Sequence, residues 1–196
     1  MSNFPKLARL KNRTLVTLFK KLPKIPKKLV QKYHALLASI SFPTSNELAK
    51  LGEIYAFLDE YNKFIATFAV CTPKCSYCCH IPVQITPIEA EFIEIQTGVK
   101  KHFRNQSVNL NSPCPFLDTK GLCSVYESRP FNCRTFHAIE NPHYCKTGEP
   151  QLTYGNAGSN YGSNILLNLR DKVHYMNHSI YPSLIVGDIR HFFDFH

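Results

Sequence analysis

Four cysteines fall within nine positions in the stretch CTPKCSYCC, residues 71–79. Thiol sulfur can hold zinc, build iron–sulfur clusters or form disulfides, so residue type alone leaves three kinds of site open. The remaining cysteines follow before residue 146, and both flanks of the chain lack them. Such clustering predicts a shared metal site, and its candidate ligands are Cys71, Cys75, Cys78, Cys79, Cys114, Cys123, Cys133 and Cys145.

The compartment of the protein bears on the choice between metal and disulfide. Residues 1–28 lack the apolar segment of a secretory signal, and no run approaches the roughly 18 apolar residues of a transmembrane helix. We therefore expect a cytoplasmic protein with no transmembrane segment. The thiol pool there opposes structural disulfides, so metal coordination is favoured.

Cys71, Cys75 and Cys78 have the C-x3-C-x2-C spacing with which radical S-adenosylmethionine enzymes hold a four-iron cluster. Those enzymes resemble a partial α/β barrel, whereas too few residues follow Cys79 for such a barrel and they do not alternate strand and helix. A radical S-adenosylmethionine-like enzyme is accordingly kept only as an alternative.

Cys78 and Cys79 are adjacent, and adjacent side chains diverge by about 100° on a helix. Two such thiols rarely reach the same metal, so Cys79 is predicted to serve a second site or to act as a redox thiol. Eight thiols agree with two four-thiolate sites, and equally with one such site plus spare cysteines.

Other side chains near the cysteines could contact a metal or cofactor. Arg129 and Arg134 flank Cys133, where they could donate to cluster sulfurs, offset thiolate charge or hold an anionic substrate. Ion pairs with carboxylates are the alternative for both arginines. With eight thiols available, three histidines are expected beside the site or at the surface rather than as zinc ligands: His80, His137 and His143.

Two helices are predicted to flank the first cysteines. Between residues 45 and 70, apolar side chains recur every three or four positions behind Ser45 as N-cap, so this helix is expected to end at Cys71. A short strand at 83–85 precedes the second helix. That helix has Thr86 as N-cap, Pro87 in its first turn, Glu89 closing a capping box and Gly98 as its stop, which assigns Glu89 to the helix rather than to a metal.

Residues 114–126 predict one short β-hairpin whose loop is residues 118–121. In that register Phe116 faces Cys123, and Cys114 points to the same face as Cys123. Diagonal neighbours of this kind lie about 7–8 Å apart, which suits two thiolates at one metal centre.

The rest of the chain predicts simpler elements. A short helix from Pro130 should turn Cys133 inward, and residues 154–164 are a polar linker. The linker leads to an amphipathic helix from about residue 165 and to an apolar tail that packs back on the domain.

Positive charge gathers at the N-terminus, because residues 1–46 carry ten Lys or Arg and no Asp or Glu. A basic amphipathic helix at residues 6–22 would suit an acidic protein partner, an anionic membrane surface, nucleic acid or mitochondrial targeting, or would pack on the domain through its leucines. We divide the chain into a basic arm (1–44), a cysteine-cluster domain (45–153), and a linker with a C-terminal helical segment (154–196). The expected fold class is α+β, a small, mostly helical domain organised around a cysteine metal site.

The motifs together resemble a known family. CTPKCSYCCHIPVQITPIEAE followed by CPFLDTKGLCSVYESRPFNCRTF is similar to the CxxCxxCC family of YkgJ-like zinc- or iron-chelating proteins, to which the cysteine domain of flagellin lysine-N-methylase is related. The first spacing is three residues here rather than two, which makes Cys71 a weaker match than Cys75. The resemblance implies metal chelation by the eight cysteines.

Two functions follow from these observations. In the first, the thiolates hold an iron–sulfur cluster, such as a 4Fe-4S cubane, for redox chemistry or protein modification. In the second, the metal is structural zinc, and the protein is a binding module whose basic arm contacts a partner. Neither the motifs nor the resemblance assigns a reaction, so enzyme activity is left open.

Overall fold

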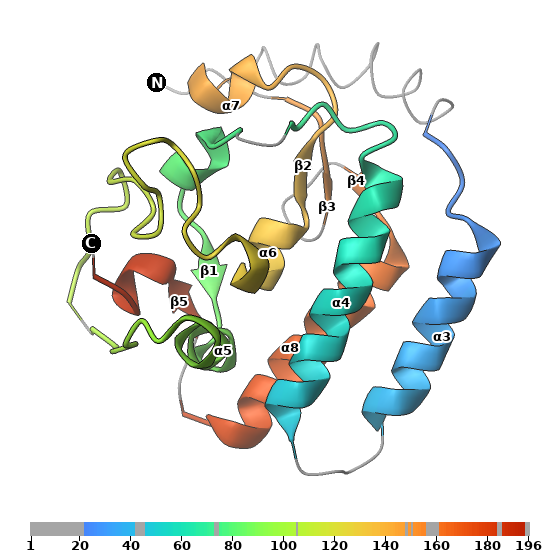
Figure 1. The fold of residues 1–196 in the computed structure, drawn as a ribbon, viewed down its shortest axis with the longest axis horizontal. Coiled ribbons are helices and arrows are strands. Elements are labelled where there is room, and N and C mark those ends of the chain that lie inside the picture. The colour runs from blue at the N-terminus through green and yellow to red at the C-terminus, as the bar shows by residue number, and fades with distance from the viewer. Residues whose placement is uncertain are drawn as a thin grey trace, which may run out of the picture.

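A computed structural model describes residues 22–41, 46–72, 75–104, 106–147, 149, 151–155, 161–183 and 186–194. Helices and a few short strands make up this part of the chain, so the α+β expectation is confirmed (Figure 1). The helices are α3 (Lys27–Ser41), α4 (Glu47–Ile65), α5 (Pro87–Thr97), α6 (Phe131–Arg134), α7 (His143–Thr147) and α8 (Asn164–Ile180), with 3₁₀ turns η1 (Tyr77–His80), η2 (Tyr126–Ser128) and η3 (Ile189–His191). The strands are β1 (Gln84–Ile85), β2 (Phe136–Ala138), β3 (Thr153–Gly155), β4 (Tyr161–Gly162) and β5 (Gly187–Asp188).

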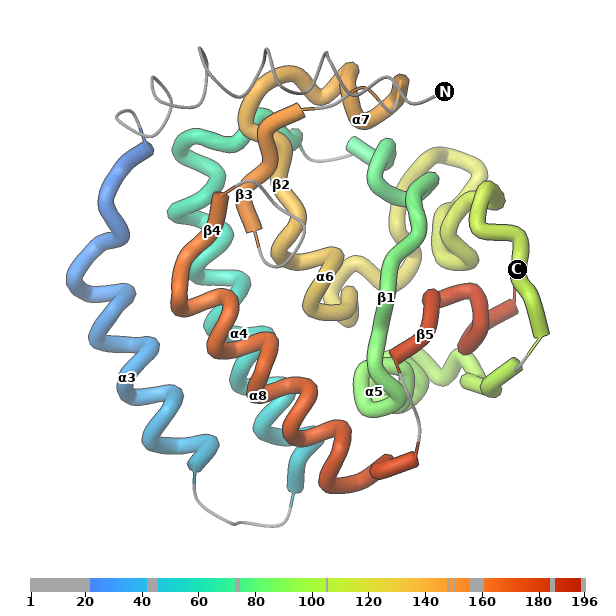
Figure 2. The backbone as a smooth tube through the Cα atoms, turned by 180° about the vertical axis from the view of Figure 1, so that it is seen from behind, coloured from blue at the N-terminus to red at the C-terminus, as the bar shows by residue number. Residues whose placement is uncertain are grey.

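The central helix α4 contacts both α3 and α8, and the three helices form one side of the molecule (Figures 1 and 2). Their facing side chains build the larger of two hydrophobic clusters, with Leu51, Leu58 and Leu166 fully buried. Apolar residues at helical spacing on α4 and α8 were expected to be buried, and they are. In the described residues, no helix is long and apolar enough to cross a bilayer.

The helix α3 was not among the expected elements, because it falls in the segment treated as a basic arm. Its Leu29, Tyr33, Leu36 and Ile40 are buried against α4, so its apolar face belongs to the same core as α8. The predicted basic helix at residues 6–22 lies almost entirely outside the described residues.

Both ends of α4 differ from expectation. The N-cap is Asn46, whose Oδ1 accepts from the backbone N–H of Ala49 at 3.1 Å; the predicted cap, Ser45, lies outside the described residues. The helix ends at Ile65 rather than at Cys71, so the predicted end is wrong. Beyond a turn at residues 66–68 the chain becomes extended, and Val70 N–H donates to the carbonyl of Ala138 in β2 at 2.9 Å.

A three-stranded sheet, in the order β2-β3-β4, joins the cysteine region to the helices. The strands β3 and β4 lie within the predicted polar linker, so that prediction is wrong at the linker's ends. Tyr154 and Tyr161 are buried there, and the Tyr61 hydroxyl lies 2.8 Å from that of Tyr154. The parallel strands approach so closely that a Cβ on Gly162 would meet the carbonyl oxygen of Gly155 at 2.1 Å, which requires glycine.

A second, smaller cluster lies around α5 and the C-terminal segment. β1 pairs with β5 in antiparallel fashion, and Ile189, Phe192 and Phe193 pack beside Ile85 and Phe116. The predicted return of the apolar tail is thus confirmed. No alternation of parallel strands and helices occurs in the described ranges, where the sheets have only two and three strands; the fold therefore does not support the radical S-adenosylmethionine alternative.

Candidate metal centre

A cavity of about 540 Å³ lies beside the smaller hydrophobic cluster, whose Phe116, Val125 and Ile189 line part of it. Its walls come from the segment leading into η1, from β1, from the turn between Cys114 and Tyr126, and from α6. We call the six thiols that line it the cavity cysteines: Cys75, Cys78, Cys79, Cys114, Cys123 and Cys133.

The first wall is the 3₁₀ turn η1, which carries the adjacent cysteines. Cys79 N–H donates to the carbonyl of Ser76 at 2.9 Å, which closes this turn. The carbonyl of Cys79 in turn accepts from Cys114 N–H at 2.7 Å. One backbone hydrogen bond therefore joins the first cysteine stretch to the second.

The second wall is the turn between Cys114 and Cys123, whose register differs from the prediction. Leu117 pairs with Cys123 in an isolated antiparallel bridge, one position away from the predicted pairing with Phe116. The turn is therefore one residue longer than predicted, and the Asp118 carboxylate stabilises it by accepting from the backbone N–H groups of Lys120 and Leu122 at 2.9 and 2.7 Å. Cys114 and Cys123 line the same cavity despite the changed register.

The third wall is α6, which begins after Pro130 and brings Cys133 to the cavity, as predicted. Its first N–H, on Phe131, donates to the buried carboxylate of Glu89 at 2.7 Å. The predicted capping box of α5 is present, with Thr86 N–H donating to Glu89 at 2.8 Å. Glu89 therefore serves both helices, and it does not line the cavity.

Two cysteines stand outside the cavity lining, and we call Cys71 and Cys145 the flanking cysteines. Cys71 Sγ accepts from Ala138 N–H at 3.3 Å. Cys145 lies on α7, which contacts η1, and its Sγ accepts from the side-chain amide of Gln151 at 2.8 Å. Both flanking cysteines thus lie on the side of η1 where β2 and α7 pack.

Burial raises the pKa of most of these thiols. It raises that of Cys71 to about 11, and the charges of Cys75, Cys78 and Cys145 add to the effect. Burial likewise raises the pKa of Cys133 well above its usual value, and there the added charges are those of Cys114, Cys78 and Cys123. The thiols thus interact in two neighbourhoods that share Cys78.

The thiols whose pKa burial raises are accordingly protonated near neutral pH, and these are Cys71, Cys114, Cys123, Cys133 and Cys145. Within the part of the chain that the structure describes, no three cysteines, histidines or carboxylates converge closely enough to form a finished metal site. Soft sulfur donors suit zinc or iron–sulfur clusters, so the donor set fits either group. Loading must displace thiol protons and draw the sulfurs together.

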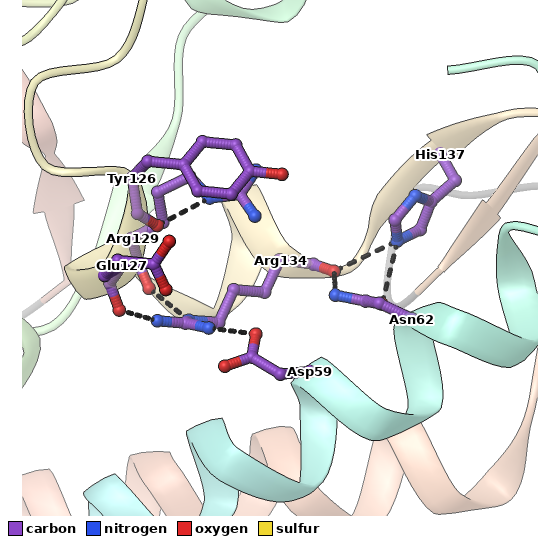
Figure 3. A network of polar contacts seen from close by, with 7 residues as sticks. All are labelled: Asp59, Asn62, Tyr126, Glu127, Arg129, Arg134 and His137. Atoms are coloured by element: carbon purple, nitrogen blue, oxygen red, sulfur yellow. Dashed lines mark hydrogen bonds and ion pairs between the residues drawn. The ribbon is translucent and has the colours of Figure 1, made fainter. Parts of the chain in front are cut away.

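The two arginines singled out in the sequence have different surroundings (Figure 3). The guanidinium of Arg134 is 1% exposed, pairs with Asp59 on α4, and donates to the carbonyls of Glu127 and Arg129. Its environment matches the ion-pair alternative. Arg129 lines the cavity, and its guanidinium stacks 3.5 Å from the ring centroid of Tyr126.

The candidate histidines do not line the cavity. His80 and His143 are exposed. His137 is partly buried, and its Nε2 donates to the carbonyl of Arg134 and to Asn62 Oδ1, at 3.0 and 3.1 Å (Figure 3). Burial lowers the pKa of His137 to about 4, so its ring is neutral at pH 7.

Sequence reasoning missed the apolar part of the cavity wall. Phe116, Val125 and Ile189 line it beside the thiols, together with the exposed Tyr126. The alternation of apolar and polar residues around Cys123 was a signal for Phe116 and Val125. Ile189 arrives from the C-terminal segment, and no local pattern places it at this site.

Comparison with known proteins agrees with this site. Residues 70–152 match the model of the CxxCxxCC family, whose description is "Putative zinc- or iron-chelating domain". This match is the family suspected from the cysteine motifs, and it covers all eight candidate ligands. No curated protein and no solved structure matched the chain. Residues 70–152 are thus similar to a cysteine domain that is described as zinc- or iron-chelating.

Proposed function

We propose that the protein holds iron–sulfur clusters through its cysteines and uses them in redox chemistry or in a protein-modification reaction. The observation that carries the proposal is the composition of the cavity lining, which has six cysteines and, among the described residues, no imidazole or carboxylate. A single zinc ion is held by four ligands that lie about 2.0–2.3 Å from the metal. A site of that radius occupies far less space than the cavity's volume of about 540 Å³. The size of the cavity therefore favours a cluster over one zinc ion.

We further propose that the eight cysteines divide into two groups of four. Cys71, Cys75 and Cys145 would form one group on the β2 and α7 side of η1. Cys114, Cys123 and Cys133 would form the other around the cavity. Cys78 and Cys79 are adjacent on η1 and both line the cavity, and we assign one of them to each group. The electrostatic interactions support this division, because the pKa of Cys71 responds to Cys75, Cys78 and Cys145. The pKa of Cys133 responds instead to Cys114, Cys78 and Cys123.

A reducing compartment such as the cytoplasm suits this function. All eight cysteines are free of disulfides in the structure. Thiolate ligands must stay reduced in order to bind metal, and the cytosolic thiol pool keeps them so.

The first experiment measures metal, sulfide and visible absorbance on protein purified without oxygen. We expect a brown protein with near-stoichiometric iron and sulfide and a broad band near 400 nm, which is the usual absorption of thiolate-bound clusters. A colourless protein with one or two zinc ions would refute the cluster. It would favour the structural-zinc module, and the search would turn to partners of the basic N-terminal residues.

Serine variants test the division. Cys133→Ser and Cys145→Ser should each lower the iron content by about half, because each removes a ligand from a different group. Ser76→Ala changes the cavity wall without removing a thiol, and it should keep the wild-type metal content. Full metal content in Cys133→Ser would contradict the assignment of the cavity cysteines.

A further inference from the structure

The cavity has one formally charged side chain in its described lining apart from the thiols, and that side chain is Arg129. The Arg129 Nε donates to the carbonyl of Tyr126 at 3.0 Å, and the Tyr126 ring covers one face of the guanidinium. Among the described residues, no carboxylate lies within ion-pairing distance of Arg129. The guanidinium is therefore held in place while its terminal N–H groups have no carboxylate to bind.

The rest of the wall away from the thiols is mostly apolar, and its uncharged polar members are Ser76, Gln84, Asn132 and Thr135. Phe116 and Val125 form its buried part, while Ile81, Leu122 and Tyr126 are large hydrophobic residues that are 38%, 37% and 51% exposed. Exposed apolar side chains gathered around one opening mark a binding surface rather than scattered surface residues. An apolar body entering this opening would cover them.

The cavity is large enough for a ligand beside a metal group. At roughly 30 Å³ per heavy atom, the share of one water molecule, a cubane of eight atoms would take about 240 Å³. That is less than half of the cavity's 540 Å³. The whole cavity lies within the range of about 300–1,000 Å³ that is typical of small-molecule sites.

We propose that this cavity binds an organic carboxylate with an apolar chain, its carboxylate on Arg129 and its chain along Ile81 and Leu122. The planar guanidinium presents paired N–H donors that match a carboxylate, and the apolar wall gains by being covered. This inference rests on the proposed function, because the metal group occupies the part of the cavity lined by thiols. The ligand would place its chain next to that group.

Calorimetric titration of the metal-loaded protein tests the proposal, with octanoate as the probe and octylammonium as its cationic counterpart. Octanoate should bind at one site, and octylammonium should bind at least tenfold more weakly. Arg129→Gln should weaken octanoate binding at least tenfold and Arg129→Lys by less, since lysine keeps the charge without the planar fork. Arg104→Gln removes an exposed arginine that pairs with Asp194, and it should bind octanoate like the wild type.

Iron content is measured on every sample, so that two failures can be told apart. A wild type without metal refutes the proposed function. If the metal-loaded wild type does not bind octanoate, or if the Arg129→Gln variant binds it as well as the wild type does, the carboxylate site alone is overturned. Loss of iron in Arg129→Gln would also overturn it, because the guanidinium would then serve the metal group.

Discussion

At the scale of single residues, burial decides what the titratable groups around the cavity do. Arg134 and Arg129 are close in sequence, yet one guanidinium is enclosed by Asp59 and backbone carbonyls and the other faces the cavity. His137 is neutral at pH 7 because burial disfavours its protonated form. This effect on the pKa is larger than the opposite effect of the hydrogen bond to the Arg134 carbonyl. Its hydrogen bonds to Asn62 and to the Arg134 carbonyl make it a link between α4 and α6.

The depressed pKa of His137 predicts a loss of stability in acid. Its pKa is about 4 in the folded protein and 6.5 in the unfolded chain, so its contribution is full above pH 6.5 and is lost as the pH falls towards 4. The loss amounts to at most about 3 kcal/mol. His137→Gln cannot titrate, so the difference in unfolding free energy between wild type and variant should shrink between pH 7 and 4.5 in denaturant titrations. A difference that does not change with pH would contradict this role.

At the scale of elements, Glu89 is the junction that orients α6 and hence Cys133. Its carboxylate is 3% exposed and accepts from the Tyr55 hydroxyl of α4 at 3.0 Å, from Thr86 at the start of α5, and from the first N–H of α6. A buried carboxylate with this many donors stabilises three elements at once. Removing it leaves each donor without a partner away from water.

Glu89→Ala should therefore lower the free energy of unfolding by about 3–5 kcal/mol, the range for a broken buried polar network. Glu94→Ala on the same helix removes a partly exposed carboxylate that, among the described residues, forms ion pairs with Lys100 and Lys101, and it should cost less than about 1 kcal/mol. Guanidinium unfolding curves of the two variants provide the comparison. Equal losses of unfolding free energy in the two variants would show that Glu89 stabilises the fold no more than an exposed carboxylate does.

At the scale of the whole molecule, the core is divided into two hydrophobic clusters, and the cavity cysteines lie beside the smaller one. The larger cluster is built by α3, α4 and α8. The smaller one has α5, β1 and the C-terminal segment, with Cys114 and Cys123 packed against it. The segments that carry cysteines contain short turns and bridges, so they have few hydrogen bonds of regular secondary structure to hold them.

Removing the metal should therefore loosen one part of the molecule selectively. Thiolate–metal bonds can contribute on the order of 10–16 kcal/mol, which is comparable to the stability of an entire domain. After chelation, we expect amide hydrogen exchange in residues 75–83 and 114–126 to accelerate at least tenfold. Exchange in the centres of α4 and α8 should change much less. Uniform acceleration along the chain would mean that the helical core also depends on the metal.

The sequence by itself determined those features of the protein that depend on residues close to one another along the chain. The capping box of Thr86 and Glu89, the Gly98 stop and the apolar faces of α4 and α8 are set by residues within one or two helical turns. The cysteine motifs likewise predicted the family that the comparison found. Each of these signals is complete within a short stretch of chain.

Only the tertiary structure decided how distant segments combine. The turn that begins at Asp118 is one residue longer than predicted, and Tyr154 and Tyr161 became buried strand residues within a stretch that resembles a linker. Ile189 joined the cavity from the far end of the chain, and packing separated the roles of Arg129 and Arg134. These outcomes depend on which surfaces meet in three dimensions, and a local pattern contains no information about its partner.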